Sequence, residues 1–312
     1  MSNQRPLTLL GPQPEYHSLR HVIERAGFEG PVALNTSGWE TEESDDEALR
    51  AAVPVDCVNL NLFARSEQLF TDDKELIETL RARQDELRHL RDVYNDRLEY
   101  MLTAARKVIR KQGALIDLTR ERESAIEMIR QLDREYLLRT EQIIDRYEEQ
   151  LNTSARPAVE HHRREIAGLL SGVSAILISG GHVAIILNRL KIFGILEMNP
   201  QLPVIAWSGG AMALSAEVIF FHDSPPQGAG NAEVLRAGMG LFGDVLPLPS
   251  ARTRLKLDDR ARVELFARRF DRYKCVVFDP ATILIRSGDG WVTEEAPVEQ
   301  LGIEGCCVEA AL

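Results

Sequence analysis

The sequence predicts an α/β protein with a mostly parallel β-sheet flanked by helices, into which a long α-helical hairpin is inserted. Short apolar runs alternate with helical patterns in residues 1–72 and again in residues 158–312. Strand–helix–strand alternation is typical of parallel sheets with crossover helices. Residues 73–157 differ, because their apolar residues recur at helical spacing over a long stretch. We therefore expect one α/β domain in two parts, with the hairpin between them.

The first part begins with an expected strand, Leu7–Leu10, and a helix, Tyr16–Ala26, which Gly27 stops. A second strand covers residues 31–35, and a third lies around residues 55–60. The acidic loop 36–46 between them lies at the carboxyl edge of the sheet, where ligands bind in open α/β sheets. It is either a divalent cation site or, as we prefer, a solvated loop.

The middle part predicts two long antiparallel helices. Residues 73–153 contain no Pro and one Gly, Gly113, which could separate the helices; a single kinked helix is the less favoured alternative. The expected apolar stripe on the first helix includes Leu87, Leu90, Tyr94, Leu98 and Met101. An exposed stripe of that length is rare on monomers, so the hairpin predicts a homo-oligomer.

The second part of the α/β domain returns to short apolar runs. The expected helices cover residues 160–170, 182–193 and 258–270. The expected strands cover residues 173–178, 203–206, 218–221, 275–278 and 282–286, and the last continues through a turn at residues 287–290 into a hairpin. A Gly/Pro-rich loop occupies residues 224–240.

Ser208 is the first candidate for chemistry. It follows a buried strand and precedes a helix that starts with the small residues Gly209, Gly210 and Ala211. A sharp strand-to-helix turn exposes such a side chain at the edge of the sheet, and the backbone N–H groups that follow it can hold an oxyanion. The pattern predicts either a nucleophile or a Ser that caps a helix.

Gly180 and Gly181, followed by His182, form the second candidate. A Gly pair between a strand and a helix lets the backbone come close to a ligand, and its N–H groups can point at an anion. The alternative is a tight turn with no ligand.

The segments ISGGHVAIILNRLKIFGI, LPVIAWSGGAMAL and GMGLFGDVLPLPSARTRL resemble the dipeptidase E and cyanophycinase family of serine peptidases. The family has a class I glutamine amidotransferase-like, Rossmann-like fold. The resemblance covers residues 1–70 and 158–290 and excludes the helical block. It implies that Ser208 is the nucleophile, that Asp223 is the acidic residue of the triad, and that Gly180 and Gly181 lie beside the active site.

The resemblance fails at the catalytic base. Where the family has a His in a Pro-His-Phe or Thr-His-Phe segment, this sequence has Leu248 followed by Pro. A Ser hydroxyl is a weak nucleophile unless a base takes its proton. His182 and His222 are the alternative bases. Because neighbouring strand residues face opposite sides, His222 and Asp223 are not expected to face Ser208 together.

Three hypotheses follow. The preferred one is a degenerate serine-peptidase-like protein, a pseudoenzyme of weak or no activity, that binds a small peptide-like or carboxylate ligand and acts in binding, assembly or regulation. The second is an active serine hydrolase of small peptides or amides, with Ser208 as nucleophile, Asp223 as orienting acid and His182 as base. The third is a mainly structural protein whose hairpin makes the functional contact.

Composition excludes several partners. The 312 residues include 48 acidic and 37 Lys or Arg residues, which gives a net charge of −11. An acidic chain lacks the cation excess that nucleic acids and anionic membranes attract. No apolar run approaches the ~20 residues of a membrane helix, and the first residues show no signal-peptide pattern. The four cysteines have no metal-ligand spacing, so we expect a cytoplasmic protein with reduced thiols and neither metal nor cofactor.

Overall fold

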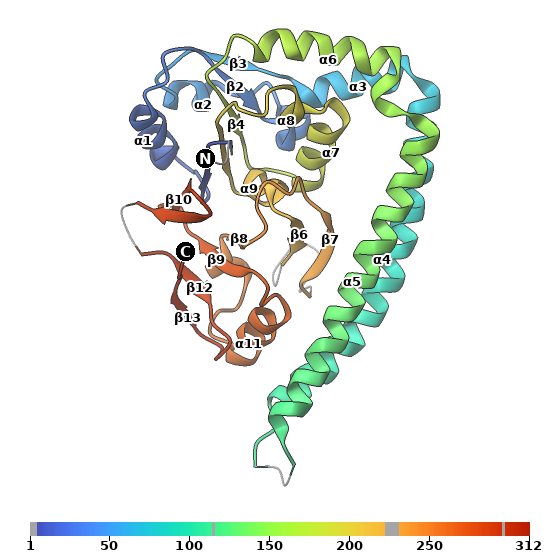
Figure 1. The fold of residues 1–312 in the computed structure, drawn as a ribbon, viewed down its shortest axis with the longest axis vertical. Coiled ribbons are helices and arrows are strands. Elements are labelled where there is room, and N and C mark those ends of the chain that lie inside the picture. The colour runs from blue at the N-terminus through green and yellow to red at the C-terminus, as the bar shows by residue number, and fades with distance from the viewer. Residues whose placement is uncertain (1–4, 114–115, 222–230, 295–296) are drawn as a thin grey trace.

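The main sheet has seven strands in the order β11-β10-β1-β5-β4-β2-β3. This computed structural model describes residues 5–113, 116–221, 231–294 and 297–312 (Figure 1). The five strands β1, β5, β4, β2 and β3 run parallel to one another, whereas β10 and β11 pair antiparallel at one edge. The sheet consists of β1 (Leu7–Leu10), β2 (Val32–Asn35), β3 (Cys57–Asn59), β4 (Ala175–Ile178), β5 (Val204–Trp207), β10 (Ile283–Ser287) and β11 (Gly290–Thr293). The predicted fold class is confirmed.

Helices cover both faces of this sheet because neighbouring residues of its central strands point to opposite cores. In β4, Leu177 packs into a core with helices α1 (His17–Ala26) and α2 (Glu47–Ala52). Ile176 and Ile178 face the second core, with α3 (Leu62–Asp72), α6 (Pro157–Leu170), α7 (Val183–Phe193) and α8 (Ile195–Met198). Burial on both faces explains the continuous apolar run of this strand.

Four strands form a second sheet in the order β13-β12-β9-β8, and two form a separate hairpin. The sheet contains β8 (Val245–Pro249), β9 (Lys274–Phe278), β12 (Glu299–Leu301) and β13 (Cys307–Glu309), and the hairpin pairs β6 (Glu217–Phe220) with β7 (Glu233–Ala237). The sequence predicted β6 and β9 but missed β7, β8, β12 and β13. Strand β8 contains Pro247 and Pro249, and it tolerates them because it pairs only with β9 at the sheet edge.

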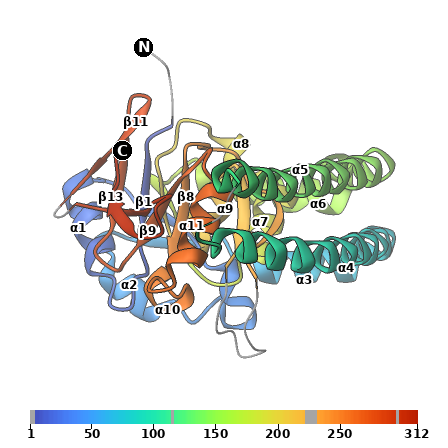
Figure 2. The same cartoon turned by 90° about the horizontal axis from the view of Figure 1, so that it is seen from below.

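The inserted hairpin consists of α4 (Lys74–Ile109) and α5 (Leu118–Leu151), which lie side by side along one side of the molecule (Figures 1 and 2). Asp73 caps α4 by accepting a hydrogen bond from the N–H of Leu76. The predicted stripe is buried within the chain at Leu90, Tyr94 and Leu98. Because the chain itself covers the stripe, it no longer argues for an oligomer, which stays a prediction. No helix in the described ranges has the length and apolar character needed to cross a membrane.

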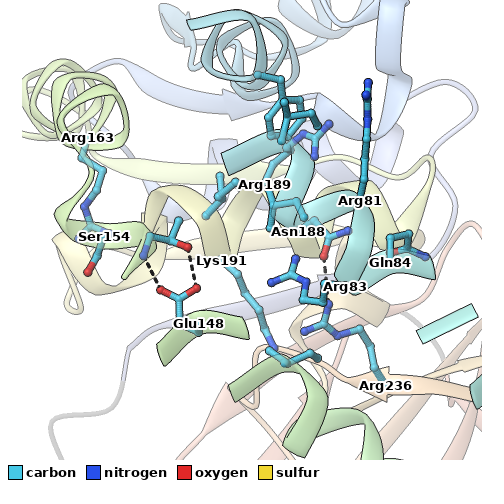
Figure 3. A pocket seen from close by; sticks show the side chains of 16 residues that line it. Arg81, Arg83, Gln84, Glu148, Ser154, Arg163, Asn188, Arg189, Lys191 and Arg236 are labelled. Carbon is cyan, nitrogen blue, oxygen red and sulfur yellow. Dashed lines mark hydrogen bonds between the residues drawn. The ribbon is translucent and has the colours of Figure 1, made fainter. Parts of the chain in front are cut away.

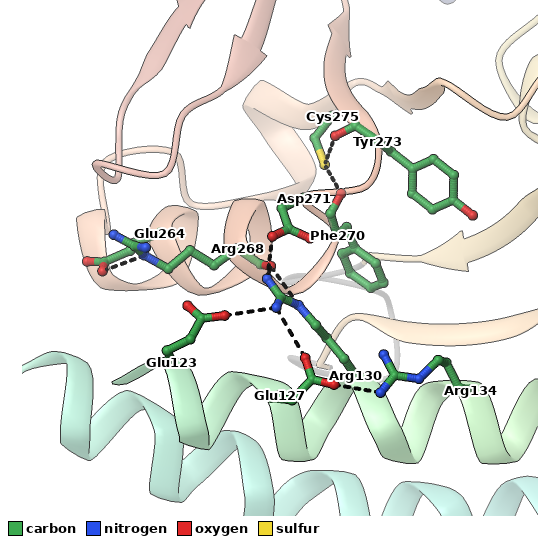
Figure 4. Close-up of polar contacts among 10 residues, drawn as sticks. All are labelled: Glu123, Glu127, Arg130, Arg134, Glu264, Arg268, Phe270, Asp271, Tyr273 and Cys275. Atoms are coloured by element: carbon green, nitrogen blue, oxygen red, sulfur yellow. Dashed lines mark hydrogen bonds and ion pairs between the residues drawn. The ribbon is translucent and has the colours of Figure 1, made fainter. Parts of the chain in front are cut away.

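The hairpin packs against α11 (Arg260–Arg269) through both α4 and α5, and Figure 4 shows the polar contacts of α5. Arg130 of α5 donates to the carbonyl oxygen of Arg268 at a distance of 3.1 Å and forms an ion pair with Asp271 just beyond α11. Tyr136 donates its hydroxyl to the carbonyl oxygen of Leu235 in β7. The insertion thus makes polar contacts with residues that lie 99 to 141 positions away in the sequence.

Candidate functional site

Ser208 lies between β5 and the short helix α9 (Gly209–Leu214), at the carboxyl end of a central strand. Its backbone has φ 52° and ψ −121°, a combination that L-residues rarely adopt and that costs roughly 1–3 kcal/mol. The chain holds this turn through the N–H of Ser208, which donates to the carbonyl oxygen of Leu10 at 3.3 Å. The arrangement is a sharp strand-to-helix turn of the kind that presents nucleophiles.

Gly180 and Gly181 pack directly against this turn. A Cβ atom on Gly180 would lie 2.8 Å from the Cβ of Ser208, and one on Gly181 would lie 2.4 Å from the carbonyl oxygen of Gly38. Any other residue would therefore push the two loops apart. In the described ranges, no hydrogen bond uses the backbone N–H of Gly181 or of Gly209. These N–H groups can donate hydrogen bonds to an oxygen atom of a ligand.

The turn borders an open cavity of about 640 Å³, a size typical of small-molecule sites. Aromatic residues form part of its wall, and the rings of Tyr16 and Trp207 meet edge to face with centroids 6.4 Å apart. Arg252 also lines the cavity, and Asp279 holds it in an ion pair of 2.8 Å. The cavity therefore offers an apolar wall and polar groups around Ser208.

No His side chain lines this cavity among the described residues. His182 precedes α7 and is exposed, and its backbone N–H donates to the carbonyl oxygen of Gly38 at 2.8 Å. No described residue forms a hydrogen bond with the Ser208 hydroxyl. His222 and Asp223 lie outside the described residues. The assignment of a base and an orienting acid therefore stays a prediction.

Leu248, which stands where the family resemblance places the catalytic His, does not face the cavity. It is fully buried in the apolar core under β8. The short helix α10 (Ala251–Arg254), which follows β8, presents Thr253 to the cavity instead. Ser250, which precedes α10, also lines the cavity and has a left-handed backbone with φ 57°. Ser250 was not predicted from the sequence, because nothing in the local pattern indicates this conformation.

The acidic loop after β2 differs from the solvated loop that the sequence favoured. Glu43 is buried, and its carboxylate accepts hydrogen bonds of 2.8 and 2.9 Å from the N–H groups of Phe63 and Ala64 at the start of α3. Burial raises the pKa of Glu43 in spite of these bonds. Asp46 is also buried and pairs with Arg50. Two of the acids therefore stabilise the fold, and no metal-binding group of three His, Cys, Asp or Glu occurs in the described ranges.

Comparison with known proteins leaves the family open. No protein-family model and no curated protein matches the sequence. Among solved structures, a peptidase from an acI-B1 Actinobacterium is similar with 14% identity and a TM-score of 0.48, over 99% of this chain and 96% of the other. A protein described as a candidate Peptidase E of Listeria monocytogenes EGD-e has 12% identity and a TM-score of 0.43, over 94% and 99% of the two chains. Function must therefore be argued from the residues of this chain.

Proposed function

We propose that this protein is a serine-hydrolase-like protein of weak or no catalytic activity, which binds a small peptide-like or carboxylate ligand in the Ser208 cavity and acts in binding, assembly or regulation. The observation that carries the proposal is the strained Ser208 turn, which borders an open cavity while no described residue activates its hydroxyl. The strained turn is present although no described residue serves as a base for Ser208, which favours a preserved ligand site.

The chemistry of the cavity suits a ligand carbonyl or carboxylate. The N–H groups of Gly181 and Gly209 can donate to an anionic oxygen. The aromatic wall formed by Tyr16, Trp39 and Trp207 can cover an apolar side chain of the ligand. Hydrolysis, by contrast, requires a base that removes the Ser208 proton. Without one, donor groups alone leave a rate advantage over water of only ~10³–10⁴-fold.

The second candidate function, an active hydrolase of small peptides or amides, is favoured by the same backbone strain, because strained residues cluster at catalytic sites. It requires a base to reach Ser208, with His182 as the candidate and Asp223 as the orienting acid. The two functions differ in turnover and not in ligand.

A binding and turnover experiment separates them. The protein is incubated with a panel of dipeptides and N-acetylated amino acids, binding is detected by ligand-observed NMR, and hydrolysis is followed by mass spectrometry. We expect wild type and Ser208→Ala to bind at least one member, with no hydrolysis that depends on Ser208. Gly180→Val should not bind, because its side chain would fill the space beside Ser208.

Two outcomes contradict the proposal. Sustained turnover that both Ser208→Ala and His182→Ala abolish would show an active hydrolase. Equal binding by wild type and by Gly180→Val would place the ligand elsewhere.

A further inference from the structure

A second cavity, of about 450 Å³, lies between the helical hairpin and α7 (Figure 3). We call it the hairpin pocket. Six of its lining residues are cationic, and they come from α4, α6, α7 and β7: Arg81, Arg83, Arg163, Arg189, Lys191 and Arg236. No residue of the described ranges lines both this pocket and the Ser208 cavity. The pocket is therefore a separate site with a concentration of positive charge, on a chain whose net charge is −11.

The described residues supply little negative charge to balance these cations. Among the described residues, Glu148 is the one carboxylate that lines the pocket, and it already accepts hydrogen bonds from the N–H and hydroxyl of Thr153, at 2.8 and 2.7 Å. Arg189 has a long ion pair of 3.7 Å with Glu67. The other five cations have no ion pair within the described ranges. Most of the positive charge of the pocket thus has no ion-pair partner among the described residues.

Arg236 is the most buried of these cations, with 9% of its surface exposed. It donates one hydrogen bond of 3.1 Å to the side-chain oxygen of Asn188, a neutral partner. Its Nε is buried without a hydrogen bond, and so are the Nε atoms of Arg83 and Arg189. Buried charged groups are normally paired, so these three guanidinium groups need an explanation.

Three of the cations also act on one another. Burial, together with the charges of Arg236 and Arg83, lowers the pKa of Lys191 to about 8. Burial likewise lowers the pKa of Arg83 and of Arg236. Glu141 of α5 attracts Arg236 and Lys191, but it forms no ion pair with either, and its Oε1 is buried without a hydrogen bond.

We propose that the hairpin pocket binds a small oxyanion with two or more negative charges, either a phosphate ester or a polycarboxylate, between Arg83, Lys191 and Arg236. Guanidinium groups match the geometry of phosphate and carboxylate oxygens and bind them through paired hydrogen bonds. The volume suits a metabolite-sized ligand. Since α4 supplies one wall and α7 and β7 supply the other, a bound anion bridges the hairpin and the α/β part.

The test uses inorganic pyrophosphate and citrate as probes, at low ionic strength, with isothermal titration calorimetry and thermal unfolding of the full chain. We expect at least one probe to bind wild type and to raise its Tm, since a ligand that binds the folded state stabilises it. The variant Arg83→Gln/Arg236→Gln should weaken binding at least tenfold. Glu141→Gln should strengthen it several-fold, because a competing carboxylate is removed.

Arg88→Gln is the matched control, since Arg88 lies on α4 but is exposed and paired with Asp85. It should bind as wild type does. Lys191→Gln guards against misfolding of the double variant. The Lys191 side chain has no hydrogen bond or ion pair with a described residue, so the substitution should weaken binding without affecting the fold.

Pyrophosphate binding without citrate binding identifies the phosphate ester as the source of the anion, and the reverse identifies the polycarboxylate. Absence of binding by both probes at millimolar concentration overturns the proposal. Unchanged affinity in the double variant and in Lys191→Gln overturns it as well.

Discussion

Asp133→Ala should be among the most destabilising single substitutions in the hairpin. Asp133 on α5 and Arg269 on α11 form an ion pair in which both side chains are almost completely buried, at 4% and 2% exposure. Arg269 donates to both carboxylate oxygens at 2.6 and 2.7 Å. The hydroxyl of Tyr94 donates to Asp133 at 2.8 Å and accepts from the N–H of Val234. Burial alone would lower the pKa of Arg269, but the charge interactions and hydrogen bonds with Asp133 and Tyr94 together outweigh it and raise the pKa.

The expected loss follows from the charge that remains. Removing the carboxylate leaves a guanidinium buried without its partner, which costs about 3–5 kcal/mol of unfolding free energy. Domains of this kind are stabilised by roughly 5–15 kcal/mol in total, so the loss is large enough to measure by urea unfolding monitored by circular dichroism. A loss below about 1 kcal/mol would refute the reasoning, because it would mean that the hairpin does not depend on this contact.

Two variants separate charge burial from a general effect of substitution. Glu135→Ala removes an exposed carboxylate two residues away, whose partner Arg97 lies at 3.3 Å, and should cost at most about 0.5 kcal/mol. Asp133→Leu/Arg269→Met removes both charges and should recover most of the loss, because apolar replacements of a buried pair are often neutral.

Three further predictions follow. Leu248→His should lower stability by about 2–4 kcal/mol without creating hydrolysis, because the imidazole enters an apolar core and not the Ser208 cavity; urea unfolding and a peptide assay check both parts. Leu90→Asp/Leu98→Asp should unfold the hairpin, as circular dichroism would show, because both residues are buried within the chain; a folded variant of reduced mass in light scattering would instead support an oligomer. Pyrophosphate affinity should fall as pH rises above 8, the region of the Lys191 pKa, because deprotonation removes a cation from the pocket. Calorimetry at pH 7 and pH 9 measures the change in affinity. Lys191→Gln should abolish the part of this change that comes from deprotonation of Lys191.

The sequence predicted the elements whose residues carry local signals. The buried strands next to Ser208 and Gly180 were found because apolar runs end there in small residues, and the hairpin was found because its spacing persists over two long helices. Strand β8 was missed because Pro247 and Pro249 argue against a strand unless its place at a sheet edge is known.

The two candidate sites also differ in whether local sequence signals predicted them. The Ser208 turn depends on neighbours in the sequence, and its pattern was visible there. The hairpin pocket combines Arg83, Lys191 and Arg236, which lie far apart in the sequence and meet only because α4, α7 and β7 pack together. In the sequence, each of these cations looks like an ordinary solvated charge.

The reactivity of the Ser208 hydroxyl tests the central claim most directly. Wild type and Ser208→Ala are each treated with a fluorophosphonate probe, and the intact mass is measured over time beside a serine hydrolase of known activity. We expect no adduct on wild type under conditions that label the control enzyme completely, because no described residue takes the Ser208 proton. A stoichiometric adduct on wild type that Ser208→Ala abolishes would contradict it and would show an activated serine.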